Sequence, residues 1–223
     1  MAPYKLIPYG ISDFAQVREE DKYYADKTMY LPKMEAAGNF LFLIRPRRFG
    51  KSLFLSMMRY YYDINEKDNF DSLFTGLWIE KNPTPLMGTF QVLYLDFSQV
   101  GGDMNSLFDR FNSRTGAVLD DFAYRYERFY YDGFAADVEK KSDFRSKLDH
   151  ITLQAKRRGI HLYLIVDEYD NFTNTVLNVA GEEVYHAMTH AEGFYRDVFK
   201  LFKPNFDRIL MMGVSPVTMD DVT

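Results

Sequence analysis

Four continuous apolar runs divide the chain and predict the strands of a sheet. The runs are residues 40–44, 92–97, 162–166 and 209–214. Their hydrophobic positions follow one another without alternation, which is typical of parallel strands that are buried on both faces. We therefore expect the four strands to lie in one sheet that is covered from both sides.

The segments between these runs carry helical signals, and strands that alternate with helices predict a three-layer α-β-α fold with a mostly parallel sheet. Asp26 or Thr28 could cap the first helix, and Gly38 ends it. The expected helices are residues 28–37, 52–62, 104–128, 142–158 and 182–202. Residues 1–20 are expected to be irregular, and residues 63–88 are expected to be loop-rich with short helical pieces.

The composition fits one globular domain over residues 1–223, in which residues 1–38 form a lead-in segment and a short helix. With 223 residues and 47% hydrophobic side chains, the chain can bury a core without disulfides or structural metals. An aromatic share of 17% fits either an aromatic-rich core or a partner interface. The absence of cysteine excludes thiolate zinc sites and a cysteine nucleophile. With no signal-peptide run and no apolar segment of about 18 residues, we expect a cytoplasmic chain without a membrane span.

A basic loop directly follows the first apolar run and resembles a phosphate-binding motif. Residues 45–52 read Arg-Pro-Arg-Arg-Phe-Gly-Lys-Ser, and the P-loop pattern G-x-x-x-x-G-K-[S/T] fits this stretch except at its first glycine. Gly50 lets the backbone approach a phosphate, and the N–H groups of Phe49 to Ser52 would point at it from the start of the next helix. Lys51 is predicted to reach the β- and γ-phosphates, and the Ser52 hydroxyl to bind Mg²⁺. Arg45 replaces the first glycine, which leaves the conformation of the opening turn undecided.

The loop also concentrates positive charge. Arg47 or Arg48 could contact the γ-phosphate and stabilise charge during its transfer. Alternatively, these arginines could pair with acids elsewhere in the domain or bind a partner. The formal net charge of −5 does not favour a nucleic-acid-binding surface over the whole chain, so nucleic acid would have to bind at this local patch.

The third apolar run ends in two acids, Asp167 and Glu168, as in a Walker B motif. Asp167 is predicted to hold Mg²⁺, and Glu168 to orient and deprotonate an attacking water. Acids that merely end a strand are common, but their position downstream of a phosphate loop favours the functional interpretation. Asp170 and Asn171 follow, and either support these acids by hydrogen bonds or cap the next helix.

Polar side chains also follow the second and fourth runs. In open parallel sheets, ligands bind at the carboxyl ends of the strands, which draws attention to Asp96, Ser98 and Ser215. Ser215 stands where a sensor residue would touch the γ-phosphate or the attacking water, although it could equally be a turn residue before Pro216. Asp96 is interpreted as a structural acid at a strand end.

Segments spread over nearly the whole chain resemble the bacterial AAA-ATPase-like family. They are Tyr24–Thr28, Arg45–Leu53, Leu95–Ser98, Val166–Asp170 and Gly213–Thr218. The resemblance implies a P-loop NTPase of the additional-strand, catalytic-glutamate division, with Arg47 to Leu53 on the nucleotide. It also implies ATP and Mg²⁺ as ligands, through Lys51, Ser52, Asp167 and Glu168.

The resemblance carries two further expectations. Many members of the family have a C-terminal nuclease-like domain of the PD-(D/E)xK type, and the sheet order of this division is 5-1-4-3-2. Because only four core strands are found, we expect a truncated chain that lacks the strand beside the first one. The exposed edge at residues 40–44 would then favour association.

Three interpretations of function remain open. The chain is an ATPase, with Glu168, Lys51 and Ser215 as catalytic residues. Alternatively, it is a non-catalytic nucleotide-binding module that regulates an effector domain or a partner, including another copy of itself. A third alternative is an interaction domain whose cationic loop binds nucleic acid or an acidic partner, for which steep salt dependence would be diagnostic.

Overall fold

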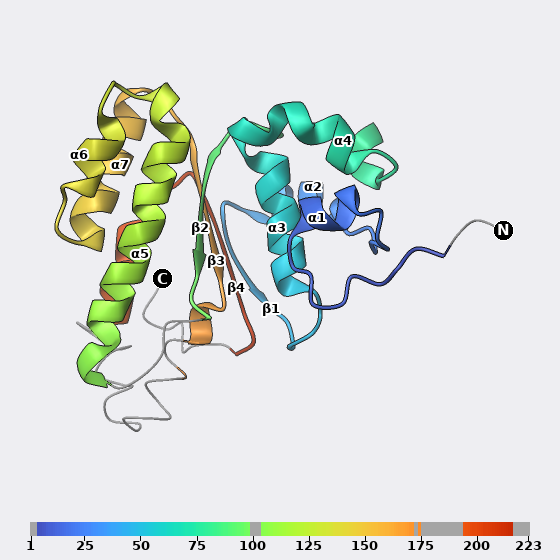
Figure 1. The fold of residues 1–223 in the computed structure, drawn as a ribbon, viewed down its shortest axis with the longest axis horizontal. Helices are drawn as coiled ribbons and strands as arrows, with labels where there is room; N and C mark the ends of the chain where they lie inside the picture. The colour runs from blue at the N-terminus through green and yellow to red at the C-terminus, as the bar shows by residue number, and fades with distance from the viewer. Residues whose placement is uncertain (1–3, 99–103, 172–173, 175–193, 216–223) are drawn as a thin grey trace.

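Helices cover both faces of a parallel sheet in the computed structural model, which describes residues 4–98, 104–171, 174 and 194–215 (Figure 1). The strands are β1 (Phe40–Ile44), β2 (Gln91–Asp96), β3 (Leu162–Asp167) and β4 (Arg208–Gly213). Their order is β1-β4-β3-β2, and all neighbouring pairs are parallel. This arrangement confirms the predicted α/β fold and matches the 1-4-3-2 part of the expected strand order.

Two groups of helices form the outer layers. On one face lie α1 (Phe14–Glu19), α2 (Leu31–Ala37), α3 (Lys51–Tyr62) and α4 (Phe70–Phe74). On the other face lie α5 (Met104–Tyr126), α6 (Phe134–Glu139), α7 (Phe144–Arg157) and α10 (Phe194–Phe202). The 3-10 turns are η1 (Thr28–Tyr30), η2 (Ile64–Asn69), η3 (Trp78–Lys81) and η4 (Glu127–Phe129).

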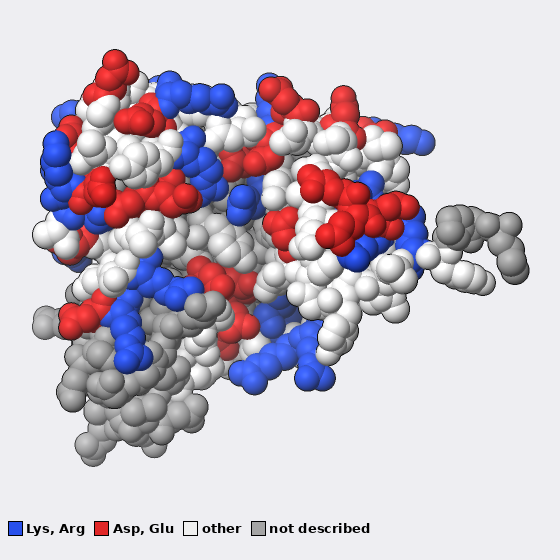
Figure 2. All heavy atoms as spheres, viewed as in Figure 1, with Lys and Arg blue, Asp and Glu red and all other residues white. Residues whose placement is uncertain are grey.

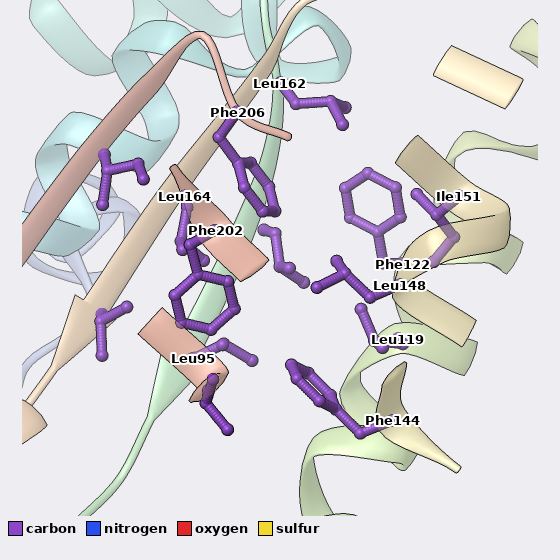
Figure 3. Close-up of a cluster of buried hydrophobic side chains, with 14 of the residues drawn as sticks. Leu95, Leu119, Phe122, Phe144, Leu148, Ile151, Leu162, Leu164, Phe202 and Phe206 are labelled. Atoms are coloured by element: carbon purple, nitrogen blue, oxygen red, sulfur yellow. The ribbon is translucent and has the colours of Figure 1, made fainter. Parts of the chain in front are cut away.

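The central strand β3 divides the core into two clusters. Leu164 and Val166 point to the α5–α7–α10 side, where Figure 3 shows aromatic rings and leucines packed together, whereas Tyr163 and Ile165 point to the α3 side. Every residue of β3 is buried, as its continuous apolar run predicts. Much of the aromatic content lies in these two clusters, so the core accounts for a large part of it.

The strand β1 has the predicted boundaries, but the prediction of burial on both faces is wrong for it. Phe40, Phe42 and Ile44 are exposed by 44%, 39% and 39%. The reason is that β1 lies at the edge of the described sheet and pairs only with β4 there. Apolar composition alone does not distinguish an edge strand from a central one.

The N-terminal segment contains a helix that the sequence analysis missed. Residues 1–20 were expected to be irregular, yet α1 begins after Asp13, whose carboxylate accepts a hydrogen bond from the Gln16 N–H at 2.9 Å. Phe14 and Val17 are fully buried, and Phe14 belongs to the α3-side core. Asp13 with Gln16 three positions later is a capping signal that could have located this helix.

The remaining predicted elements agree closely with the structure. The expected helix at residues 28–37 consists of η1 and α2, and the short helical pieces expected between residues 63 and 88 are η2, α4 and η3. Of the helix expected at 182–202, the described part is α10, and residues 182–193 lie outside the described residues. Within the parts of the chain that are described, no helix is long and apolar enough to cross a membrane.

Candidate active site

The register of the sheet brings the predicted motifs to one edge. Asp96 pairs with Asp167, and Ile44 pairs with Gly213, so the carboxyl ends of all four strands finish at nearly the same level. The loop from β1 to α3 begins at this level, and Asp167 and Glu168 lie at the same level, at the end of β3. The structure therefore places together two motifs that are separated by more than one hundred residues of chain.

The opening turn of the loop at residues 45–52, the candidate phosphate loop, needs no glycine at position 45. The Arg45 N–H donates to the Gly213 carbonyl at 3.0 Å, which extends the β1–β4 pairing by one residue. Left-handed backbone occurs later in the loop, at Arg48 (φ 67°) and Gly50 (φ 70°). Glycine tolerates this conformation without strain, whereas arginine adopts it at a cost. The departure from the P-loop pattern at Arg45 is thus compatible with a closed loop.

The side chain of Lys51 lies across the loop and contacts the loop's backbone. Lys51 is the first residue of α3 and is only 8% exposed. Its Nζ donates to the Pro46 carbonyl at 3.3 Å, across the loop. A buried ammonium group at the start of a helix strengthens the positive field there, which favours an anion.

Ser52 and Asp167 form the closest link between the two motifs. The Ser52 hydroxyl donates to Asp167 Oδ2 at 2.6 Å, and the Tyr94 hydroxyl donates to the same oxygen at 3.2 Å. Asp167 is 3% exposed, and burial raises the pKa of its carboxyl although both hydroxyl groups favour the ionised form. Tyr94 was missed by the sequence analysis because its place beside Asp167 depends on the pairing of β2 with β3.

Glu168 has an unusual backbone conformation for a residue with a side chain. Its φ is 51°, in the left-handed region, and its N–H donates to Asp167 Oδ1 at 2.9 Å. Burial and the neighbouring Asp167 raise the pKa of Glu168, while Lys51 acts in the opposite direction. Backbone strain of this kind concentrates at functional sites, and a raised carboxyl pKa suits a group that accepts a proton.

Asp170 and Asn171 tie the neighbouring strand ends to the loop after β3. Asp170 Oδ2 accepts hydrogen bonds from the Val214 N–H at 3.1 Å, the Ser215 N–H at 2.8 Å and the Ser215 hydroxyl at 2.8 Å. The Asn171 amide donates to the carbonyls of Phe97 and Ser98 at 3.0 and 3.1 Å. Among the described contacts, Asp170 thus binds the chain just after β4, at Val214 and Ser215. Asn171 binds the chain just after β2, so the loop after β3 is hydrogen-bonded to the ends of both neighbouring strands.

The loop arginines are exposed at the same end of the molecule. Arg45 donates to the Ile44 carbonyl at 3.2 Å, whereas Arg47 and Arg48 make no hydrogen bond or ion pair with the described residues. In Figure 2, Lys and Arg side chains gather where the β1–α3 loop lies in Figure 1, with Asp and Glu side chains beside them at the strand ends. Phe49 is also exposed, and Leu53 is half-buried against the α3-side core.

The donor atoms at this edge suit a magnesium ion. The Ser52 hydroxyl and the Asp167 carboxylate are oxygen ligands that already lie within 2.6 Å of each other. Across the described residues, no group of three or more His, Cys, Asp or Glu side chains is placed to hold a metal. Mg²⁺ commonly keeps several waters and binds one or two protein ligands together with substrate phosphates, so a two-ligand site fits its chemistry.

Comparison with known proteins gives one family and one curated relative. The family model described as "AAA-ATPase_like: Predicted AAA-ATPase" matches residues 8–223. The "Uncharacterized protein in vnfD 5'region" of Azotobacter chroococcum mcd 1 is 45% identical over 76 residues, which are 34% of this chain and 14% of the relative. The aligned stretch thus spans about a seventh of that protein's length. No solved structure matches the chain.

Proposed function

The chain belongs to the family of predicted AAA-ATPases, and on this premise we propose that it binds Mg-ATP on residues 45–53 and hydrolyses it. The observation that carries the proposal is the 2.6 Å hydrogen bond between the Ser52 hydroxyl and Asp167 Oδ2. A serine after the P-loop lysine and an acid at a strand end are the two groups that hold Mg²⁺ in P-loop NTPases. Here they meet although 115 positions separate them in the chain.

The proposed roles follow from the positions of the side chains. Lys51 Nζ would exchange the Pro46 carbonyl for phosphate oxygens, and the N–H groups of Phe49 to Ser52 would face the same phosphates. Ser52 and Asp167 would hold Mg²⁺, which when bound neutralises charge on the β- and γ-phosphates.

Glu168 would accept a proton from the attacking water. The water oxygen then bonds to the γ-phosphorus as the bond to the β-phosphate oxygen breaks, which releases ADP and phosphate. The raised pKa of Glu168 makes it a better proton acceptor than an ordinary exposed carboxylate. Arg47 and Arg48, which have no described partner, are available to contact the γ-phosphate, and Ser215 lies at the end of β4 on the same edge.

A second candidate is a nucleotide-binding module without turnover, which would regulate an effector domain or a partner. Two observations favour it. The Ser215 hydroxyl is bound to Asp170, and the curated relative extends far beyond the stretch it shares with this chain. In this case the Mg-ATP site is the same, but hydrolysis is absent.

A Glu168→Gln substitution separates the two candidates. For the ATPase, phosphate release from Mg-ATP should fall at least about 100-fold, because the general base is lost, while Mg-ATP binding is retained. Glu19→Gln, an exposed position on α1, serves as the control and should leave turnover unchanged. Turnover that Glu168→Gln does not affect would refute the role of Glu168. A wild-type chain that binds Mg-ATP without releasing phosphate would favour the regulatory module.

A further inference from the structure

The segment Tyr24–Thr28 brings a lysine to the phosphate loop from a different part of the chain. Lys27 Nζ donates to the Phe49 carbonyl at 3.2 Å. It also lies 3.5 Å from the position that a Cβ on Gly50 would occupy. A cation is therefore held beside the part of the loop whose N–H groups are proposed to face the nucleotide phosphates.

The residues on either side of Lys27 fix this placement. Asp26 Oδ1 accepts from the backbone N–H and the hydroxyl of Thr28, at 2.8 and 2.7 Å, and Asp26 Oδ2 accepts from the Trp78 N–H at 2.7 Å. Thr28 is fully buried and accepts a hydrogen bond from the Ile79 N–H at 3.2 Å. Asp26 and Thr28 thus fasten the segment to η3, and Lys27 between them is directed to the loop.

A cavity of about 270 Å³ lies between this segment and the phosphate loop. Tyr30 and Met34 line it from the η1–α2 side, and Leu43 and Met212 line it from the sheet. Tyr30 remains 49% exposed and Phe49, across the cavity, 62% exposed. Large apolar rings that are left this accessible around a hollow are typical of a ligand-binding surface.

The cavity and the Ser52–Asp167 pair lie on opposite flanks of α3. Lys51 and Phe54 of α3 line the cavity together with β1 and β4. Ser52 and Ser56 instead line a separate hollow with Asp167, on the side of β2 and β3. A ligand whose phosphates lie on the loop could therefore extend away from the metal-binding side and into the cavity.

We propose that this cavity receives the purine base and ribose of the nucleotide, and that Lys27 contacts its phosphate chain. This inference rests on the proposed function, since it concerns the same ligand. None of the described residues that line the cavity is an acid or an amide, so the base is held by stacking and apolar contact. The cavity contributes affinity for a nucleoside triphosphate that inorganic triphosphate cannot obtain.

The test compares Mg-ATP with Mg-tripolyphosphate by calorimetry on the full chain. Tyr30→Ala should weaken Mg-ATP binding about tenfold, through the loss of one stacking partner, and leave Mg-tripolyphosphate binding unchanged. Lys27→Ala should weaken both ligands about tenfold, since a charge-assisted contact to phosphate is lost. The exposed positions Tyr23 and Lys81 provide controls, and Tyr23→Ala and Lys81→Ala should alter neither affinity.

A second variant guards against misfolding. Met34→Trp fills the cavity from α2 and should also weaken Mg-ATP selectively, and the thermal unfolding of each variant shows whether it folds. If Lys51→Ala abolishes ATP binding but folded Tyr30→Ala and Met34→Trp proteins bind both ligands like the wild type, the cavity assignment is wrong and the proposed function stands. If the folded wild type does not bind ATP, or Lys51→Ala binds it equally well, the proposed function fails and the cavity assignment fails with it.

Discussion

Gly213 and Asp170 illustrate how single residues shape the edge that carries the candidate site. Asp170 is 3% exposed and collects three hydrogen bonds from Val214 and Ser215. This is only feasible because β4 ends in a residue without a side chain: a Cβ at Gly213 would lie 2.4 Å from Asp170 Oδ1 and 2.7 Å from the Tyr169 ring. The absence of a side chain at Gly213 thus lets the loop after β3 pack against the end of β4 and hydrogen-bond to the residues that follow it.

A Gly213→Ala substitution tests this packing. The added methyl group must displace Asp170 or the Tyr169 ring, so we expect the free energy of unfolding to fall by about 1–3 kcal/mol in urea denaturation. Gly116→Ala is the matched control, because a Cβ there would meet only Lys147 at 3.7 Å and the position is inside α5. The control should be neutral or slightly stabilising. Equal stability of the two variants would contradict the proposed constraint.

For single residues, the sequence predicts which side chains could carry the chemistry better than it predicts which side chains touch one another. Ser52, Asp167 and Glu168 could be proposed as site residues because each lies in a recognisable local pattern, and their roles stay predictions. The contact of Tyr94 with Asp167 and the insertion of Lys27 beside the loop depend on strand order and on the packing of the N-terminal segment. No local pattern encodes these two relationships.

Among the elements, α7 shows how the side chain of the N-cap residue, here Asp143, sets where a helix begins. Asp143 Oδ1 accepts from the Ser146 N–H at 2.9 Å, and Asp143 Oδ2 accepts from the hydroxyls of Ser142 and Ser146 at 2.8 and 2.9 Å. These hydrogen bonds lower the pKa of Asp143 below its usual 3.8, and the bond from the Ser146 N–H has the largest effect. The ionised carboxylate is therefore favoured in the folded state.

This cap predicts a pH-dependent contribution to stability. Asp143→Ala should lower the free energy of unfolding by about 1 kcal/mol at neutral pH. Because the folded-state pKa is lowered, the stabilisation by the charged carboxylate is complete above the usual value of 3.8 and is lost as the pH falls through the folded value. Urea denaturation of wild type and Asp143→Ala along a pH series should show that their difference in the free energy of unfolding shrinks as the pH falls. With Asp143→Asn, which retains an acceptor, a pH-independent difference from wild type would contradict the electrostatic part.

Most elements could be located from the sequence because their periodicity is strong. The errors, which are the missed six-residue helices α1 and α6 and the predicted burial of β1, have physical causes. The helix α1 is only six residues long, too short for a hydrophobic period to emerge, so its cap at Asp13 was the available signal. The exposure of β1 depends on which strands flank it, and this is a property of the assembled sheet. Boundaries within the long helices differ by at most two residues from the predicted ones.

For the molecule as a whole, the edge strand β1 is the surface most suited to association. Phe40, Phe42 and Ile44 remain exposed along it, and within the described chain β1 has one strand neighbour. Exposed edge strands with apolar side chains offer unpaired backbone groups and an apolar surface to another chain.

We therefore expect the chain to associate as its concentration rises. Phe40→Lys should suppress this association in sedimentation velocity, because a charged side chain on an edge strand disfavours pairing. Tyr124→Lys, at a 58% exposed position on α5, introduces the same charge and should not suppress it. If Tyr124→Lys suppresses association as strongly as Phe40→Lys, or if the wild type stays monomeric, this interpretation of the edge is wrong.

The central claim, that the loop at residues 45–52 and Asp167 form one Mg-nucleotide site, is tested most directly by calorimetric titration of ATP into the folded chain. The wild type should bind ATP saturably and more tightly with Mg²⁺ than without it. Lys51→Ala should remove this binding, because it deletes the ammonium group that donates across the loop to the Pro46 carbonyl and is proposed to contact the phosphates. Binding that survives Lys51→Ala unchanged, or a folded wild type that binds no ATP in the presence of Mg²⁺, would contradict the claim.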